Sequence, residues 1–453
     1  MNYFMGRIQF YAAIVIANIV AFLLKTFTKS SATSLPGVVA LRICPDFIRK
    51  AQKYCKNDVI NITGTNGKTT TAGLFAHILM RASKKVLHNE KGANMLTGIA
   101  STLVEGVGFS RKSDYFVLES DEAYLTKLYD FLDANFLLVT NLFRDQLDRY
   151  GELDTTYKKI QEAIDKNSNL KVVLNADDPM VALLGSNNDR IFFGFEDIKF
   201  MFETVDAKAP AESVVCVNCG KNLSYEKRFY AHLGDYKCDC GYKRPELKYK
   251  ADAMIFLDYS ILNIRSEEKE LNYRVNLPGL YNVYNSLAAI LMALELNVDE
   301  SIIQEALDSY HSVFGRAESL VLKGKKTLVQ LIKNPVGASE VLRLIGDNKK
   351  SKLLIMLNDN YADGRDVSWI WDANFEILKN YTQKIVISGD RAYDMAVRLK
   401  YAGVAESQFE IKRDIEKAMN KAIQMTTADE TLLILPTYTA LLKMQGIVKK
   451  IKD

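Results

Sequence analysis

The segment with the clearest chemistry is a glycine-rich stretch that follows an apolar run at residues 59–63. Its residues are Gly64, Thr65, Asn66, Gly67, Lys68, Thr69 and Thr70. Glycines let backbone N–H groups close around phosphate oxygens at the start of a helix, where the helix dipole favours anions. Lys68 would place a cation on the terminal phosphates, and the Thr69 hydroxyl would bind Mg²⁺. The stretch predicts a nucleotide site, because an ordinary strand-to-helix turn would not require the lysine.

Four of the six cysteines form a second pattern. Cys216 and Cys219 make a C-x₂-C pair, Cys238 and Cys240 make a C-x-C pair, and a glycine follows each pair. Four thiolates at such spacing are typical of a tetrahedral structural Zn²⁺ site in a ribbon-like insert. A redox dithiol pair is the alternative. Since the protein would fill all four positions of the metal, we expect no catalysis by it.

A third cluster of chemical groups is acidic. Residues 358–372 follow an apolar run and contain both tryptophans of the chain, Trp369 and Trp371, together with four aspartates. Asp359 comes first after the run, and Asp363 and Asp366 follow it. The residues alone leave open a solvated loop or a Mg²⁺ shell. The tryptophans could anchor a protein interface or pack inside the domain.

The elements that must position these groups alternate between strands and helices. We expect strands at residues 59–63, 115–118, 136–140, 171–174 and 191–193, and later at 327–332, 352–357, 384–388 and 430–435. Helical sequence separates them, which predicts parallel sheets flanked by helices and an α/β fold. The divisions we expect are an apolar leader with a linker at 1–34, a nucleotide-binding domain at 35–314 with a polar, Cys-rich insert at about 207–249, and a C-terminal domain at 315–453.

Length and composition exclude several classes of protein. The chain has 453 residues, of which 48% are hydrophobic, so it can form several cores and is neither a small module nor disordered. Its net charge of +4 comes without the Lys/Arg blocks of a nucleic-acid binder. Residues 8–24 carry no charge and would span about 26 Å as a helix, short of a hydrocarbon core of about 30 Å. We expect a helix packed on the first domain, with contact to a membrane surface as the alternative, and a cytoplasmic location.

Further segments of the sequence resemble the motifs of one known protein family. Glu119 ends a strand, residues 140–148 read TNLFRDQLD, residues 279–285 read GLYNVYN, residues 314–318 read FGRAE, and residues 333–335 read KNP. In this order they resemble the motifs of the Mur ligase and folylpolyglutamate synthetase superfamily. The resemblance implies ATP and Mg²⁺, and a reaction in which a carboxylate becomes an acyl phosphate that an amine then attacks. It implies catalytic roles for Lys68 and Glu119, Mg²⁺ ligation by Thr69 and Glu119, and nucleotide contacts by residues 64–70, Asn141, Asn282, Asn285 and Arg316.

Three departures narrow the resemblance. Gln146 stands where ordinary Mur ligases have a metal-holding histidine, and Gln330 stands where an aspartate precedes their H-N-P. Neither Lys158 nor Lys159 is in register with the lysine that they carbamoylate. These positions handle a second metal and an incoming amino acid, so we expect a second substrate that is not an amino acid. With the four-cysteine insert and the acidic segment, the chain resembles the MurT family, the Mur-ligase-like subunits of lipid II isoglutaminyl synthase.

The MurT resemblance implies partners and a reaction. It implies a heterodimer with a GatD-like class I glutaminase subunit that supplies ammonia, and ATP-dependent amidation of D-glutamate in lipid II to D-isoglutamine, at the inner face of the cytoplasmic membrane. The family's glutaminase takes an aspartate from this subunit to complete its Cys–His pair. Asp359 is the first choice here, with Asp363 and Asp366 as alternates. An amino-acid-adding ligase and a noncatalytic nucleotide-binding scaffold for a glutaminase remain as alternatives.

Overall fold

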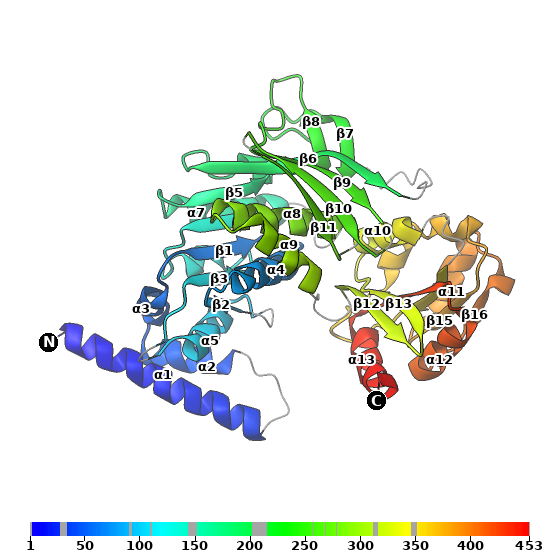
Figure 1. Cartoon of the computed structure of the whole chain (residues 1–453), viewed down its shortest axis with the longest axis horizontal. Coiled ribbons are helices and arrows are strands. Elements are labelled where there is room, and N and C mark those ends of the chain that lie inside the picture. Colours follow the sequence, from blue (N-terminus) through cyan, green and yellow to red (C-terminus); the bar gives the residue numbers. More distant parts are fainter. Residues whose placement is uncertain are drawn as a thin grey trace.

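The structure is a computed structural model of the chain. It describes all residues except 1, 28–33, 90–92, 109–110, 144–151, 202–214, 257, 268, 278, 311–315, 346–350 and 453. Two sheet-based bodies stand side by side, and a small hairpin lies against the larger one (Figure 1). The expected α/β fold class is confirmed.

The larger sheet has nine strands in the order β11-β10-β9-β6-β5-β4-β1-β3-β2. Its neighbours pair in parallel from β2 to β9, and β9, β10 and β11 pair antiparallel. The chain passes from β3 on one side of β1 to β4 on the other, so a ligand crevice is expected at the carboxyl end of β1. The strands are β1 (Val59–Thr63), β2 (Val86–His88), β3 (Tyr115–Glu119), β4 (Phe136–Val139), β5 (Lys171–Asn175), β6 (Arg190–Phe200), β9 (Tyr249–Ile255), β10 (Ser260–Arg265) and β11 (Glu270–Val275).

Helices cover both faces of this sheet, because the central strands are apolar on both sides. Ile60 and Val117 point into a core with α4, α8 and α9, whereas Val59 and Phe116 point into a core with α1, α2, α3, α5, α6 and α7. The helices on this body are α1 (Asn2–Phe27), α2 (Leu35–Ile43), α3 (Phe47–Ala51), α4 (Lys68–Arg81), α5 (Leu96–Gly106), α6 (Leu125–Leu128), α7 (Glu152–Asp165), α8 (Leu280–Glu295) and α9 (Glu300–Ser309), with 3₁₀ turns η1 (Gln52–Tyr54) and η2 (Val181–Leu183).

The first helix packs on the domain, as expected from sequence. Phe10, Ala13, Ile14 and Ala17 are buried in the core shared with α2 and α5. The polar group in the middle of this apolar helix is also satisfied, since Asn18 Nδ2 donates to the carbonyls of Ile14 at 2.9 Å and Val104 at 3.2 Å.

The Cys-rich segment is more ordered than its sequence predicts. Strands β7 (Ser224–Tyr230) and β8 (Leu233–Lys237) form an antiparallel hairpin outside the large sheet. The antiparallel extension β9 to β11 was not expected either, and β6 runs well beyond the expected 191–193.

The second body has a six-stranded sheet in the order β12-β13-β17-β14-β15-β16, parallel except for the β12–β13 pair. Two apolar clusters, one on each face, pack its helices on the sheet, as in a Rossmann-like domain. The strands are β12 (Arg316–Leu322), β13 (Lys325–Gln330), β14 (Ser351–Met356), β15 (Ile385–Ser388), β16 (Phe409–Ile411) and β17 (Thr431–Pro436). The helices are α10 (Pro335–Ile345), α11 (Ala392–Tyr401), α12 (Ile415–Met425) and α13 (Tyr438–Lys452), with 3₁₀ turns η3 (Ser368–Trp371), η4 (Phe375–Asn380) and η5 (Glu406–Gln408).

Candidate functional site

The glycine-rich stretch forms the turn between β1 and α4, at the crevice that the sheet topology predicts. Gly64 has a φ of +125° and Gly67 a φ of +87°, conformations that side chains rarely adopt. Neither position has room for a side chain. A Cβ on Gly64 would lie 2.3 Å from Thr140 Oγ1, and one on Gly67 would lie 2.0 Å from Asn285 Oδ1. Both glycines are therefore required by the turn and by its neighbours. We call residues 64–70 the phosphate loop.

Lys68 lies folded over the phosphate loop. Its ammonium donates to the carbonyls of Gly64 and Thr65, and pairs with Glu122 Oε2 at 3.1 Å. Both side chains of the ion pair are largely buried. The sequence analysis missed Glu122, although it lies only three residues after Glu119. A phosphate would replace the Glu122 carboxylate as the anion beside Lys68.

The neighbouring carboxylate, Glu119, fits a divalent cation. Its Oε1 accepts hydrogen bonds from Thr69 Oγ1 at 3.1 Å and Asn94 Nδ2 at 3.3 Å. Its Oε2 is buried and has no hydrogen-bond partner among the described residues. A buried carboxylate oxygen without a donor is costly, and oxygen ligands are the ones Mg²⁺ prefers. Asn89 fixes the Glu119 backbone through two hydrogen bonds of 2.8 Å.

Thr140 and Asn141 shape the phosphate loop from the end of β4. Asn141 accepts from Asn66 N at 2.9 Å and donates to Asn66 O at 3.1 Å, and Thr140 Oγ1 donates to the same carbonyl at 2.7 Å. Because both ends of the Asn141 amide bond the loop backbone, its side chain holds the loop in shape.

The remaining expected nucleotide contacts are only partly described. Asn285 on α8 accepts from Thr71 Oγ1 at 3.4 Å, which places it beside the phosphate loop. Asn282 lies in the first turn of the same helix. Arg316 begins β12, but its side chain lies outside the described residues, as do Gln146 and Gly315.

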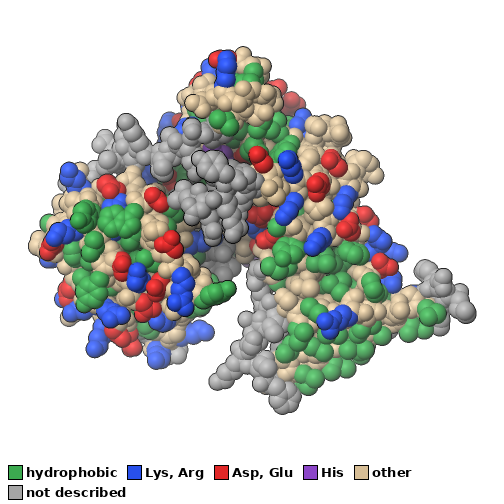
Figure 2. Space-filling view, turned by 180° about the vertical axis from the view of Figure 1, so that it is seen from behind, with side chains coloured by type: hydrophobic (Ala, Val, Ile, Leu, Met, Phe, Trp, Pro, Cys, Tyr) green, Lys and Arg blue, Asp and Glu red, His purple; other side chains and the backbone are tan. Residues whose placement is uncertain are grey.

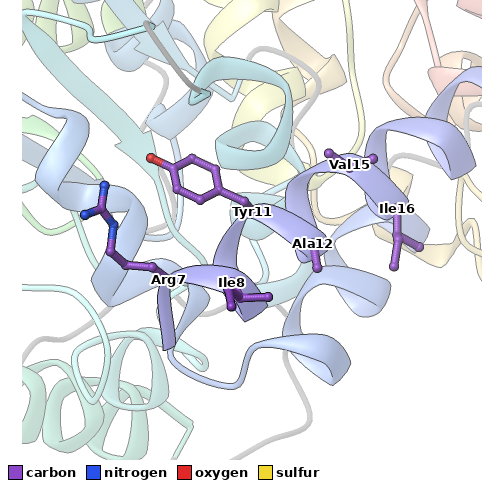
Figure 3. Close-up of a pocket in the computed structure, with 6 residues that line it drawn as sticks. All are labelled: Arg7, Ile8, Tyr11, Ala12, Val15 and Ile16. Atoms are coloured by element: carbon purple, nitrogen blue, oxygen red, sulfur yellow. The ribbon is translucent and has the colours of Figure 1, made fainter. Parts of the chain in front are cut away.

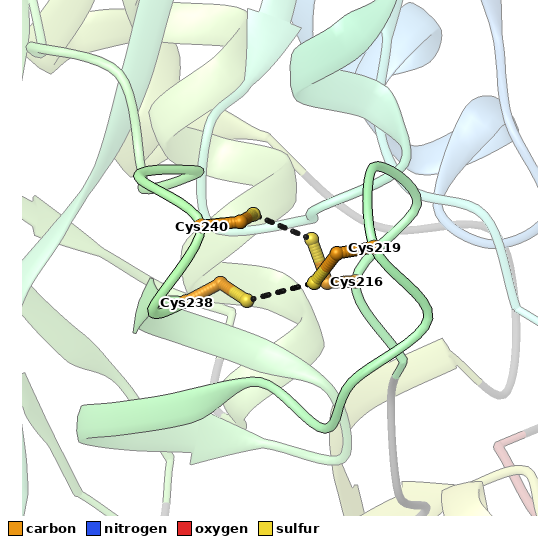
Figure 4. Close-up of side chains that lie close together, drawn as sticks. All are labelled: Cys216, Cys219, Cys238 and Cys240. Carbon is orange, nitrogen blue, oxygen red and sulfur yellow. Dashed lines mark hydrogen bonds between the residues drawn. The ribbon is translucent and has the colours of Figure 1, made fainter.

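The four cysteines of the insert converge (Figure 4). Their sulfur atoms all lie within 4.8 Å of one another, with Cys216–Cys240 at 3.5 Å and Cys219–Cys238 at 3.4 Å. A tetrahedron with Zn–S bonds of about 2.3 Å has sulfur atoms about 3.8 Å apart, so the cluster fits this metal. Burial raises the pKa of Cys216, but backbone donors and neighbouring thiols outweigh it and lower that pKa to about 7. All four thiols are free of disulfides.

The acidic segment lies at the carboxyl end of β14, and the three candidate aspartates in it differ in their contacts. Asp363 accepts from Thr439 N at 2.7 Å and Asn360 N at 3.1 Å, and Asp366 accepts from Ser368 N at 2.8 Å. Hydrogen bonds from the backbone and side chain of Ser368 lower the pKa of Asp366. Asp359 has, within the described part of the chain, one long ion pair of 3.7 Å to Arg391 Nε. Asp366 is the more exposed residue, but among the described contacts Asp359 is the one of the three whose carboxylate accepts no backbone hydrogen bond.

Comparison with known sequences assigns both bodies. The Mur ligase middle domain family matches residues 62–293, and the MurT ligase C-terminal family matches residues 331–441. The chain is 37% identical over 420 residues to the lipid II isoglutaminyl synthase (glutamine-hydrolyzing) subunit MurT of Streptococcus pneumoniae, covering 92% of each chain. It is 37% identical to the same-named subunit of Staphylococcus aureus strain COL, covering 91% of this chain and 92% of the relative. The chain belongs to the MurT family.

Solved structures agree on the fold. This MurT-family chain resembles a pseudomurein peptide ligase type C from Methanothermus fervidus with a TM-score of 0.66 at 24% identity, covering 90% of this chain and 81% of the other. It resembles MurF from Acinetobacter baumannii with a TM-score of 0.65 at 17% identity, covering 92% and 80%. The predicted family, Mur-ligase fold and ligase class are confirmed, and ATP and Mg²⁺ follow from the family.

A buried acidic turn in this MurT-family chain was not expected from sequence. Asp177 and Asp178 follow β5 and have fully buried side chains. Burial raises the pKa of Asp177 to about 6, against the opposing effect of Arg244 at 3.0 Å. Asp177 also accepts from Tyr284 OH on α8 at 2.8 Å. Two neighbouring aspartates after a strand were the only hint of this turn in the sequence. Their position does not predict the contacts with Arg244 and Tyr284, which lie far along the chain.

Proposed function

We propose that this chain is the synthetase subunit that amidates the α-carboxylate of D-glutamate in the lipid II stem peptide, giving D-isoglutamine. Residues 35–314 bind the nucleotide, and residues 315–453 face a glutaminase partner. The observation that carries the proposal is the phosphate loop with Lys68 and Glu119 in place. It occurs in a chain that matches, over 92% of its length, a protein named as a lipid II isoglutaminyl synthase subunit.

The phosphate loop accounts for the first step of the reaction, the formation of the acyl phosphate. Loop N–H groups and Lys68 hold the phosphates of ATP, and Thr69 and Glu119 hold Mg²⁺, which offsets phosphate charge when bound. A carboxylate oxygen of the substrate attacks the γ-phosphorus, the bond from that phosphorus to the ADP oxygen breaks, and an acyl phosphate and ADP result. Ammonia then attacks the acyl carbon with its lone pair. Phosphate leaves, and the nitrogen loses a proton to give the amide.

The insert is proposed to hold structural Zn²⁺. Four thiol ligands leave no open position for a substrate, so the ion would stabilise the fold of the insert. Its presence would be measured as about one zinc per chain by elemental analysis of the purified protein.

The surface around Asp359 supports a protein partner. Tyr361, two residues after Asp359, is 92% exposed, and Tyr393, two residues after the Arg391 that pairs with Asp359, is 61% exposed. Trp371 is half exposed and lies against Tyr401, which ends α11. Tyrosine and tryptophan are enriched at protein interfaces because they contribute large contact areas at low entropic cost. We propose that a GatD-like glutaminase binds this face as a heterodimer and takes Asp359 as the acid of its catalytic triad.

Helix α1 supports a location at the inner face of the cytoplasmic membrane. Its segment Met5–Leu24 is long and apolar enough to span a membrane, with a mean hydropathy of 1.9 and 28% of it buried. Apolar side chains gather over this part of the molecule (Figure 2). A hollow of about 620 Å³ along one side of the helix is lined by Arg7, Ile8, Tyr11, Ala12, Val15 and Ile16 (Figure 3). The exposed apolar residues are Met5, Ile8, Val15, Ile16, Ile19, Phe22 and Leu23.

We expect this exposed face of α1 to bind lipid bilayers. In sedimentation with phosphatidylglycerol vesicles, the double variant Ile19→Asp with Phe22→Asp should lose most of the vesicle-bound fraction, because each charge opposes burial among acyl chains. The matched control is Val321→Asp, at an exposed apolar position on β12. Equal binding by all three proteins would contradict membrane contact through α1.

The amidation itself is tested by reconstitution. Purified chain, a GatD-like glutaminase, lipid II, ATP, Mg²⁺ and glutamine should give amidated lipid II, with ADP released in equal amount. Incorporation of an amino acid without any partner would instead identify an amino-acid-adding ligase. ATP binding and complex formation without ADP release would identify a noncatalytic scaffold.

A further inference from the structure

The tip of the β7–β8 hairpin is buried in the nucleotide-binding body. Along the hairpin, most of residues 224–228 are exposed, whereas residues 229–234 are buried. His232, at the tip, is 5% exposed, and its ring lies against Phe143 with centroids 4.6 Å apart. The hairpin that carries two of the four cysteines just beyond its end therefore reaches the segment that follows β4.

His232 shares one carboxylate oxygen with that segment. Asp178 Oδ2 accepts from the backbone N–H of Leu142 at 2.7 Å and lies 3.1 Å from His232 Nε2. Because the oxygen of a carboxylate is an acceptor, Nε2 carries the proton of this hydrogen bond. Asp178 is fully buried, and its other oxygen, Oδ1, accepts from the backbone N–H groups of Met180 at 2.9 Å and Val181 at 3.2 Å. His232 and Leu142 are therefore the two donors that satisfy Oδ2.

The Leu142–Phe143 segment in turn holds the phosphate loop. Phe143 N donates to Thr65 Oγ1 at 3.0 Å, and Thr65 N donates to Asn141 O at 2.9 Å. Four hydrogen bonds thus join His232 to the phosphate loop through Asp178 and residues 141–143.

The cysteine cluster holds the other side of the same acidic turn. Tyr242 O accepts from Cys238 N at 2.7 Å, and Tyr242 OH donates to the carbonyl of Pro179 at 2.5 Å. Cys216 packs in a small core with Ala182 and Tyr236. The residues around the cysteine cluster and the hairpin tip therefore both contact residues 177–182.

We propose that His232 is a positioning residue for nucleotide binding, through which the cysteine insert and its metal hold the phosphate loop in shape. The proposal depends on nucleotide binding by the loop and is independent of which carboxylate is amidated. It assigns the insert a function in the ATP site in addition to its own stability.

The first test uses three variants at one position. Gln offers a donor near the place of Nε2, Phe keeps the ring on Phe143 without a donor, and Ala removes both. With a fluorescent, non-hydrolysable ATP analogue and Mg²⁺, His232→Phe and His232→Ala should raise Kd about tenfold, while His232→Gln stays within about threefold of wild type. Zinc content should stay unchanged in His232→Phe.

A matched control separates positioning from general destabilisation. Leu262→Ala creates a cavity at a fully buried position of β10. It should lower the unfolding temperature at least as much as His232→Phe and leave nucleotide Kd unchanged. If His232→Phe binds the analogue as wild type does, or if Leu262→Ala weakens binding equally, the proposal is wrong.

The second test removes the metal. Zinc is stripped with a chelator, the chelator is removed, and Mg²⁺ and the analogue are then added. Wild type should lose about tenfold in nucleotide affinity and recover it on adding Zn²⁺. His232→Phe should lose little more on stripping, because its link to the loop is already broken. An unchanged Kd in zinc-free wild type, or an equal further loss in the variant, would overturn the coupling. If stripping unfolds the chain, the variant series above decides.

Discussion

The phosphate loop and the acidic segment of the C-terminal domain lie at the carboxyl ends of parallel strands, but they are completed differently. In the phosphate loop, the key side chains meet partners from the same chain: Lys68 meets Glu122, Thr69 meets Glu119, and Asn141 meets Asn66. In the acidic segment, Asp363 and Asp366 accept backbone hydrogen bonds, whereas the side chain of Asp359 is 30% exposed and makes one ion pair of 3.7 Å within the described residues.

This difference separates a site that one chain builds from a site that needs another molecule. Contacts within this chain hold the phosphate loop in shape, so a nucleotide has to displace Glu122 from Lys68 but does not have to build the loop. A partly exposed carboxylate close in sequence to the exposed Tyr361 has the features of an interface. The comparison predicts that damage to the phosphate loop stops the reaction with any nitrogen source, whereas damage at Asp359 stops it only with glutamine.

The largest effect is expected at Lys68. Lys68→Ala should lower amidation at least about 10³-fold with either glutamine or ammonium chloride, because the cation on the transferred phosphate is lost. Rates of ADP release and of amide formation should fall together. A Lys68→Ala variant that lost only the glutamine-driven rate would contradict the comparison, because Lys68 would then be needed for the glutaminase reaction and not for phosphoryl transfer.

A smaller effect is expected where the two bodies approach each other. Glu340 on α10 is buried, and its charge acts on Tyr281 of α8. Burial raises the pKa of Glu340 from 4.5 to about 7, with Arg343 opposing the shift. The folded chain therefore binds more protons than the unfolded chain between these values, and this group makes the unfolding free energy fall as pH rises through that window.

Glu340→Gln should remove that titration. From pH 4.5 to 8, the unfolding free energy of the variant should rise relative to wild type by about 2–3 kcal/mol, as measured by urea denaturation. Parallel pH curves for the two proteins would show that Glu340 does not titrate with a raised pKa. Loss of ATP affinity in the variant would further indicate that the junction contributes to the phosphate loop.

Sequence was most informative where function depends on neighbours along the chain. The phosphate loop and the four cysteines were identified because a turn and a metal site require fixed residue types at short spacing. The parallel sheets followed from alternating apolar segments, whereas the antiparallel β9–β11 extension that follows the insert did not.

Contacts between distant residues were not predictable in this way. Lys68 and Glu122 are 54 residues apart, as are Asp178 and His232, and no spacing rule links either pair. Among the three aspartates, sequence could rank only by distance from the strand. The structure distinguishes them by hydrogen bonding, since Thr439, which bonds Asp363, comes from the start of another helix. The roles of Asp359 and of the nucleotide contacts stay predictions.

The most direct measurement compares two nitrogen donors in one complex. Asp359→Asn and its matched control Asp363→Asn are each assembled with the glutaminase, and lipid II amidation is followed with glutamine and with ammonium chloride. Asp359→Asn should lose about 10³–10⁴-fold of the glutamine-driven rate and keep the ammonium-driven rate within about twofold. Asp363→Asn should lower both rates in proportion, because it loosens the segment. Full glutamine-driven activity in Asp359→Asn, or equal loss with both donors, would contradict the proposed division between the two sites.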